Sequence, residues 1–330
     1  MGRQEDIFII ARQVIAAKEQ CGGVRRVVWI GAGGSNGGNY PAQYFMEHEA
    51  TRLSSSMFTS KEFVLAPPKY VDETTLAVVV SMRGTPETIE AARVAKKHGA
   101  MVVALYVDES ELTELADYII QYESLALDES DMGKTNSAIT LALAIELVNQ
   151  TEGYDAYEDA VKSLEGVDAV YRRAVEFAIP RAREWAVRNA HRPTINVLGA
   201  GPTFGASYVF SICNIQEMLQ IDSVTTNSCD FFHGPFEVLD KDTSVFLLMG
   251  VGRCREADER ALAFLEKYGG DLVYVLDARD LGLDIFPSSV AEYFNHLVLS
   301  PILNNVYMRT LSKVTGKDYM TRRYMWQIEY

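Results

Sequence analysis

The sequence predicts an α/β protein with two tandem domains, each a parallel sheet flanked by helices in the flavodoxin-like, doubly wound arrangement. Short runs of apolar, mostly β-branched residues alternate with longer amphipathic stretches, and this alternation is typical of right-handed βαβ units. A glycine-rich turn also occurs twice, about half a chain apart. Repetition of this kind indicates that one fold has been duplicated.

The strands expected in the first half are its apolar runs, at residues 26–30, 75–80 and 101–107. Helices are expected between them, at residues 39–51 and 86–98. Residues 155–189 contain few helix breakers, so one or two long helices are expected there. The two copies of the turn are GAGGSNGGNY and GAGPTFGASY, at residues 31–40 and 199–208. We therefore predict two domains, at residues 1–165 and 166–330.

Composition excludes several classes of protein. The net charge is −14 and no run of Lys or Arg occurs, so a nucleic-acid partner is not expected. Apolar segments such as residues 245–251 are far shorter than the roughly 20 residues of a membrane span, and charges within residues 1–13 argue against a signal peptide. The four cysteines show no metal-binding spacing. We expect a cytoplasmic protein with reduced thiols and no metal.

A glycine-rich turn after a strand first suggests a dinucleotide site. That motif needs a third glycine and an acidic residue about 20 positions later. Asn36 and Phe204 stand where the third glycine would be, and no Asp or Glu lies within residues 52–60. We therefore expect neither a nicotinamide nor a flavin cofactor.

The same turn geometry suits a single phosphate group. Gly34 lets backbone N–H groups approach an anion, Ser35 adds a hydroxyl, and the following helix directs its positive end at the site. A second hydroxyl-bearing turn, with Ser81, Arg83 and Thr85, follows the expected strand at 75–80. Ligands of open α/β sheets bind at this edge, and an arginine there would clamp a phosphate. The alternative is only a well-capped helix, with Thr85 as its N-cap.

His233 is the histidine best placed for acid–base chemistry. It lies in the segment DFFHGPFE, where Gly234 and Pro235 force a turn and three phenylalanines are expected to exclude water. A histidine in such a turn can have its pKa tuned near neutrality; the alternative is a core histidine that caps the turn. Of the others, His296 is predicted to be structural, with a substrate-side role left open, and three are predicted at the surface: His48, His98 and His191.

Glu217 precedes His233 by sixteen residues and is predicted to end the helix after the second glycine-rich turn. Its neighbours include Cys213, Ile215 and Met218. A carboxylate among apolar residues is either a solvated helix edge or a base tuned by its surroundings. The sequence around Glu217 does not separate these two roles.

A glutamate followed sixteen residues later by a His-Gly-Pro turn resembles the enzymes built from sugar-isomerase (SIS) domains. More narrowly, FFHGPFE at 231–237 and RRYMWQIEY at 322–330 resemble the fructosamine-6-phosphate deglycases, and the resemblance extends over nearly the whole chain. It implies a cofactor-independent enzyme that converts a 6-phosphofructose–amino acid conjugate (an Amadori compound) and water to glucose 6-phosphate and the free amino acid.

The resemblance also implies roles for individual residues. Glu217 and His233 would be the catalytic pair, and Ser35, Ser81 and Thr85 would bind phosphate. Lys134 and Thr135 correspond to a loop that lines the sugar, although Thr135 as an ordinary helix cap is an equal alternative. In related enzymes the His-Gly-Pro turn comes from a neighbouring subunit, so an obligate homodimer with shared active sites is expected.

Two departures from the family pattern bear on activity. The segment from Ser81 to Thr85 is one residue shorter between its glycine and threonine than the family turn. Cys229 and Asp230 stand where the deglycase branch usually has Gly-Glu. Asp230 is taken as a sugar-binding residue, and its shorter side chain puts the strength of that interaction in doubt.

Other functions remain open from the sequence. A phosphosugar aldose–ketose isomerase or an aminosugar-phosphate deaminase would use the same turns and acid–base pair. A non-catalytic phosphosugar sensor is a third alternative, but it would have no need for Glu217 with His233. The sequence does not identify the amino acid of the substrate. It also leaves two roles for Arg322 and Arg323: pairing with a substrate carboxylate, or fastening the tail through salt bridges.

Overall fold

The computed structural model describes residues 3–329, and the side chains of residues 6–329. The segments 1–13 and 322–330 discussed above extend beyond this range by residues 1–2 and by residue 330. The chain divides into two compact units, Met1–Gly166 and Val167–Tyr330. Among the described residues, no helix is both long enough and apolar enough to cross a membrane.

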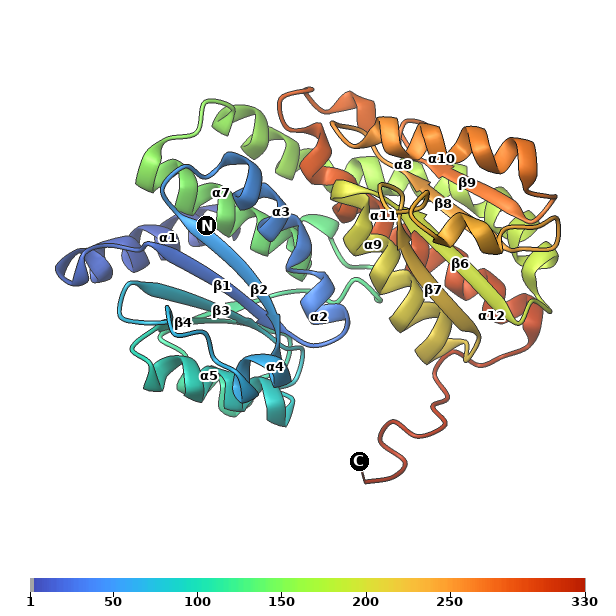
Figure 1. Cartoon of the computed structure of the whole chain (residues 1–330). Coiled ribbons are helices and arrows are strands. Elements are labelled where there is room, and N and C mark those ends of the chain that lie inside the picture. Colours follow the sequence, from blue (N-terminus) through green and yellow to red (C-terminus); the bar gives the residue numbers. More distant parts are fainter. Residues whose placement is uncertain (1–2, 330) are drawn as a thin grey trace. The chain divides into compact units, whose positions relative to one another are not determined.

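The first unit contains a five-stranded, fully parallel sheet in the order β2-β1-β3-β4-β5 (Figure 1). Its strands are β1 (Arg26–Gly31), β2 (Ser54–Thr59), β3 (Thr75–Val80), β4 (Met101–Tyr106) and β5 (Tyr118–Gln121). The three predicted strands are β1, β3 and β4. They are buried on both faces, which explains their continuous apolar character.

Helices cover both faces of this sheet. One face packs on α4 (Ser60–Leu65), α5 (Pro86–Lys97) and α6 (Glu111–Leu115) through a shared apolar core. The helices α1 (Arg3–Lys18), α3 (Tyr40–Glu49) and α7 (Asn136–Glu152) form the other layer. The predicted helices at 39–51 and 86–98 are α3 and α5, and the doubly wound arrangement is confirmed.

The second unit repeats the arrangement with four parallel strands in the order β7-β6-β8-β9. These strands are β6 (Thr194–Gly199), β7 (Asp222–Asn227), β8 (Val245–Met249) and β9 (Val273–Asp277). The helical segments of this unit are the part of α8 (Tyr157–Asn189) from Val167 onward, α9 (Phe204–Val209), η4 (Phe210–Met218), α10 (Arg255–Tyr268), α11 (Asn295–Ile302), η8 (Leu303–Met308) and α12 (Arg309–Thr315). Helix α8 is a single helix of 33 residues despite Pro180 in its interior.

Alternating side chains of β8 separate two cores on the two faces of this sheet. On one face, Phe246 packs edge-on against Trp185, Phe210 and Tyr307. On the other, Leu247 belongs to a cluster with Phe231 and with Leu265 of α10. The segment η4, which begins at Phe210, and the segment around Phe231 therefore lie on opposite faces of the sheet.

His296 lies fully inside this unit, on α11. It is 2% exposed, and its Nδ1 atom has no hydrogen-bond partner among the described residues. Burial lowers the pKa of His296 to about 4, because a charged imidazole loses its hydration there. This environment supports the structural role predicted for His296.

We expect His296→Leu to reduce the loss of stability in acid. With a folded pKa near 4 and an unfolded pKa of 6.5, the unfolded chain binds the proton first, so stability falls as the pH falls from 6.5 to 4. The depressed pKa corresponds to about 3 kcal/mol across that window. Urea unfolding of both proteins at several pH values measures the difference.

The raised pKa of Asp258, about 6, acts in the opposite direction but is common to both proteins and cancels in the comparison. His191→Leu, at an exposed histidine, is the control and should follow the wild-type pH dependence. Equal pH dependence of wild type and His296→Leu would contradict the prediction.

Candidate active site

The first glycine-rich turn joins β1 to a short helix, α2 (Gly34–Gly37). Gly33 has a φ of 54° and a ψ of −126°, which residues with a Cβ rarely adopt. Gly34 is exposed and Ser35 is half-buried. Helix α2 has only four residues, and α3 starts separately at Tyr40. Gly34 is therefore accessible to a ligand, but the helix directly behind the turn is shorter than the sequence suggests.

The second turn follows β3, which is the neighbour of β1. Ser81 is buried, and its hydroxyl oxygen accepts hydrogen bonds from the N–H groups of Gly84 and Thr85 at 3.1 and 3.2 Å. Gly84 has a φ of 68°, and a Cβ there would overlap the side chain of Ser110. Because parallel strands end at the same edge, both turns lie at one edge of the sheet.

Thr85 occupies the N-cap position of α5 but makes no side-chain capping bond. Its hydroxyl pairs instead with that of Thr88 at 2.8 Å, and Thr88 pairs with buried Ser60 at 2.8 Å. Arg83 is 74% exposed, and its Nε atom lies 3.0 Å from Asp108. The hydroxyl of Thr85 is thus held by a buried chain of hydroxyls, whereas Arg83 is exposed and pairs with Asp108 through its Nε atom.

Tyr122, directly after β5, also reaches this edge. Its hydroxyl forms a hydrogen bond with the side chain of Ser35, and burial raises the pKa of Tyr122 to about 12. On the opposite side of the first turn, Thr140 of α7 donates a hydrogen bond to the carbonyl of Gly38 at 2.9 Å. Two elements distant in sequence therefore support the turn that carries Ser35.

The loop with Lys134 and Thr135 leads into α7. The ammonium group of Lys134 lies 3.5 Å from Glu123 and 3.8 Å from Asp131. Thr135 is buried, and its hydroxyl donates to the carbonyl of Met132 at 2.9 Å. It stands at the N-cap position of α7 without a capping bond. The threonine therefore shapes the loop, while the lysine is half-exposed beside two acids.

The second copy of the glycine-rich turn is closed. Thr203 is fully buried, and its hydroxyl donates to the carbonyl of Ala200. The amide of Asn295 pairs with both backbone groups of Val251 at the end of β8. The carboxylate of Asp258 accepts a hydrogen bond from the N–H of Gly250. Side chains fill this edge of the sheet. The buried carboxyl group of Asp258 also disfavours the binding of a phosphate there.

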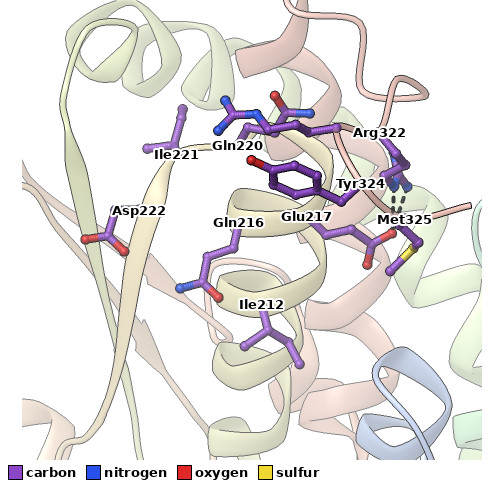
Figure 2. A pocket seen from close by; sticks show the side chains of 10 residues that line it. Ile212, Gln216, Glu217, Gln220, Ile221, Asp222, Arg322, Tyr324 and Met325 are labelled. Carbon is purple, nitrogen blue, oxygen red and sulfur yellow. Dashed lines mark hydrogen bonds and ion pairs between the residues drawn. The ribbon is translucent and has the colours of Figure 1, made fainter. Parts of the chain in front are cut away.

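Glu217 lies on η4, which is a π-helix rather than the α-helix that the sequence suggests. Its Oε1 atom accepts from Nε and Nη2 of Arg322 at 2.9 and 2.8 Å (Figure 2). The side chain of Glu217 is 25% exposed and that of Arg322 is 8% exposed. A further hydrogen bond from Arg322 to the carbonyl of Tyr319 fixes the tail. Glu217 is therefore a half-buried carboxylate held by the C-terminal segment.

A cavity of about 630 Å³ lies beside this ion pair. Figure 2 shows η4 on one side of it and the tail on the other. The lining residues are Ile212, Gln216, Glu217, Gln220, Ile221, Asp222, Arg322, Arg323, Tyr324 and Met325. This volume falls within the usual range of small-molecule sites.

The environment of His233 differs from the prediction. The turn forms as expected, with φ at Gly234 of 131° and a short 3₁₀ helix, η5 (Pro235–Val238), after it. His233 itself is exposed. The three neighbouring phenylalanines pack against one another and against Phe264 of α10. The prediction that they exclude water from His233 is wrong, because their rings turn inward to the core.

Asp230 supports the turn through its backbone. Its carbonyl accepts a hydrogen bond from the N–H of His233 at 2.9 Å. Within residues 6–329, no hydrogen bond joins its carboxylate to the His233 ring. The exposed side chains of this turn point to solvent, where a ligand or another chain can reach them.

The second sheet lies between the two residues of the predicted catalytic pair. The segment that carries Glu217 packs on the face of Phe246, and the turn that carries His233 packs on the face of Leu247. The two segments therefore lie on opposite faces of the sheet. Within one copy of this unit, the pair is not brought together.

Known proteins resemble this chain in sequence and fold. The chain is 31% identical over 313 residues to the fructosamine deglycase FrlB of Bacillus subtilis, and the match covers 93% of each chain. The chain belongs to the fructosamine deglycase family. No family model matches it.

One further relative is similar at lower sequence identity, and two are solved structures. The fructoselysine 6-phosphate deglycase of Escherichia coli is 22% identical, over 73% of this chain and 71% of its own. A Salmonella typhimurium protein provisionally described as a phosphosugar isomerase superimposes with a TM-score of 0.93 and 35% identity, over 98% and 99% of the two chains. A Bacillus subtilis protein with the same description gives 0.90 and 31%, over 97% of each chain.

Two features of the candidate site were missed by sequence reasoning. Tyr122 follows a weakly apolar edge strand, and the one available signal was its position at the carboxyl end of that strand. The partner of Glu217 was missed because Arg322 is 105 residues away. Its role in fastening the tail was one of the two that the sequence left open.

We expect Arg322→Ala to release the tail. The substitution leaves the half-buried Glu217 carboxylate without its partner, a cost of about 1–3 kcal/mol, or roughly 10-fold or more in the population of the detached tail. Limited chymotrypsin digestion followed by mass spectrometry measures cleavage near Tyr324.

Arg323→Ala is the matched control, because it leaves the ion pair with Glu217 intact and should keep wild-type resistance. Arg322→Lys should be intermediate, since an ammonium group cannot reproduce the guanidinium geometry. A tail in Arg322→Ala as resistant as that of the wild type would show that the ion pair does not hold it.

Proposed function

We propose that this chain is a cofactor-independent deglycase that converts a 6-phosphofructose–amino acid conjugate and water to glucose 6-phosphate and the free amino acid. The observation that carries the proposal is the match to a fructosamine deglycase over nearly the full length of both chains. The fructoselysine 6-phosphate deglycase among the relatives supports a phosphorylated substrate. Because water is consumed, the overall reaction is a hydrolysis.

In this mechanism the phosphate binds at the edge formed by the two turns of the first unit. Gly34, Ser35 and Thr85 present N–H and hydroxyl groups there, Ser81 organises the second turn, and Arg83 adds charge when it leaves Asp108. Binding energy from the phosphate holds the open-chain sugar in position for chemistry at its other end. Lys134, Thr135 and Asp230 are the residues that we assign to the sugar.

The chemistry needs two proton-transfer groups. His233 assists opening of the sugar ring. Glu217 removes a proton from C1, which gives a 1,2-enaminol, and returns a proton at C2. The resulting imine at C1 is hydrolysed by water to the aldehyde of glucose 6-phosphate, and the amine leaves as the amino acid. Positioned acid–base groups typically contribute about 10²- to 10⁴-fold each.

We further propose a homodimer with shared active sites. The segments that carry Glu217 and His233 pack on opposite faces of the second sheet, and this supports a site to which two chains contribute. The exposed position of His233 suits a turn that enters the site of a second chain. The four cysteines are free thiols, which suits action in the cytoplasm.

Mixed dimers test this proposal. Glu217→Gln and His233→Ala should each lower kcat/KM by about 10²-fold or more on a phosphorylated fructosamine. When the two variants are denatured, mixed in equal amounts and refolded, mixed dimers contain one intact site. Activity should then return to about a quarter of the wild-type value, as random pairing of subunits predicts.

Each variant refolded alone is the control and should stay inactive. Recovery in the mixture together with inactivity alone supports shared sites. Full activity of either single variant would contradict the catalytic assignment. If the refolded mixture recovered no activity, the shared site would be contradicted. A glucosamine 6-phosphate assay run in parallel distinguishes an aminosugar deaminase.

Phosphate binding is tested separately with Ser35→Ala. Loss of one hydrogen bond to a charged group should raise KM by about 10-fold, with little change in kcat, because the phosphate is remote from the reacting carbon. Inorganic phosphate should also inhibit the variant less strongly. Ser54→Ala, at an exposed serine at the start of β2, is the control; if both serine variants kept the wild-type KM, Ser35 would not be a ligand.

A further inference from the structure

We infer that the cavity beside Glu217 binds the amino acid half of the substrate, and that Arg323 pairs with its carboxylate. This inference rests on the proposed function, because it takes Glu217 as the base that acts on C1. It adds the place where the amino acid binds and one specificity-determining residue.

The reaction itself fixes where the amine must lie. The carbon that loses its proton, C1, is bonded directly to the amine nitrogen. If the Glu217 carboxylate reaches C1, it therefore also lies within a few bond lengths of the first atoms of the amino acid. The cavity of about 630 Å³ is the space that Glu217 borders, and it has room for such a substituent.

The two arginines of the tail differ in what they can do. Arg322 is 8% exposed in its side chain, and its three guanidinium nitrogens contact Glu217 and the carbonyl of Tyr319. Arg323 also lines the cavity, but it is exposed and forms no ion pair with any residue in the range 6–329. Its guanidinium lies 6.0 Å from the ring centre of Tyr324. Of the two, Arg323 is the one available to an incoming carboxylate.

The remaining lining residues fit a short amino acid. Ile212, Ile221 and Met325 supply apolar wall. Gln216 is fixed by a hydrogen bond from its Nε2 to the carbonyl of Ser223 at 2.8 Å. The charged groups that line the cavity are Glu217, Asp222, Arg322 and Arg323.

The other acid of the cavity, Asp222, is on the strand side in Figure 2, away from Arg322. Its carboxylate is occupied by the N–H of Ser223 at 2.9 Å and by the hydroxyl of Thr194 at 3.4 Å. A substrate carboxylate is therefore repelled by Asp222, whereas the charge of Glu217 is already paired with Arg322. Arg323 is the lining residue whose positive charge is left to attract the carboxylate.

The backbone near the cavity is unusual at Gln220. Its φ is 57°, which is uncommon for a residue other than glycine. The side chain of Gln220 forms two hydrogen bonds with the C-terminal segment. Its Oε1 accepts from Lys317 at 2.7 Å, and its Nε2 donates to the carbonyl of Thr321 at 3.4 Å. Residues with strained backbone angles are frequent at ligand sites. Here the side chain of the strained residue connects the end of η4 to the tail.

A matched pair of substrates tests the inference. The 6-phosphofructose conjugates of glycine and of glycinamide differ only in a carboxylate and a neutral amide. The wild-type enzyme should prefer the glycine conjugate. Arg323→Gln should lower kcat/KM for the glycine conjugate by about 10-fold or more, as expected for a hydrogen-bonded charge pair, and should leave the glycinamide conjugate nearly unchanged.

Two further variants control the experiment. Arg323→Lys keeps the charge and should retain part of the preference for the glycine conjugate. Arg183→Gln, at an exposed arginine of α8, should behave as the wild type on both conjugates. Thermal melting of each variant checks that the fold is intact.

The outcomes separate this inference from the proposed function. If the wild type releases glucose 6-phosphate from neither conjugate, the deglycase proposal fails and the inference fails with it. If both conjugates are substrates but Arg323→Gln changes both equally, or changes neither, the deglycase stands and the role of Arg323 is overturned. A selective loss on the glycine conjugate supports both.

Discussion

A parallel sheet that lies between a carboxylate and an imidazole is the constraint on which the functional interpretation depends. In the second unit, β8 directs Phe246 to the face of Glu217 and Leu247 to the face of His233. Side-chain flexibility cannot overcome this separation, because the strands and both cores are buried. The proposed acid–base pair would therefore be completed by another copy of the chain, and assembly would then be a condition for chemistry.

The ion pair between Glu217 and Arg322 adds a second dependence, this time on the tail. A half-buried carboxylate is costly to leave unpaired, and its partner here is contributed from 105 residues further along the chain. Both contacts of the guanidinium fall on Oε1, which leaves Oε2 for a proton. The tail is thus coupled to the orientation of a proposed base, and it also forms one wall of the adjacent cavity.

The sequence predicted the buried parts of the fold well and the polar parts poorly. The runs at 26–30, 75–80 and 101–107 are strands because apolar residues on both faces of a buried sheet leave a plain signal. The edge strands β2 and β7, with sequences SSSMFT and DSVTTN, carry no such signal and form because a buried neighbour offers them hydrogen bonds. The π-helical turn at Glu217 and the inward packing of the phenylalanines around His233 depend on tertiary contacts, so local patterns could not reveal them.

The glycine-rich turns of the two units differ in whether side chains fill the adjoining sheet edge. One copy retained an open edge that can hold an anion, and the other filled the same edge with Thr203, Asn295 and the protonation-prone Asp258. The two units therefore differ at the same place in the fold, because the first keeps an accessible turn where the second has packed polar side chains. The proposed assignment of substrate binding to the first unit and of proton transfer to the second is consistent with this difference.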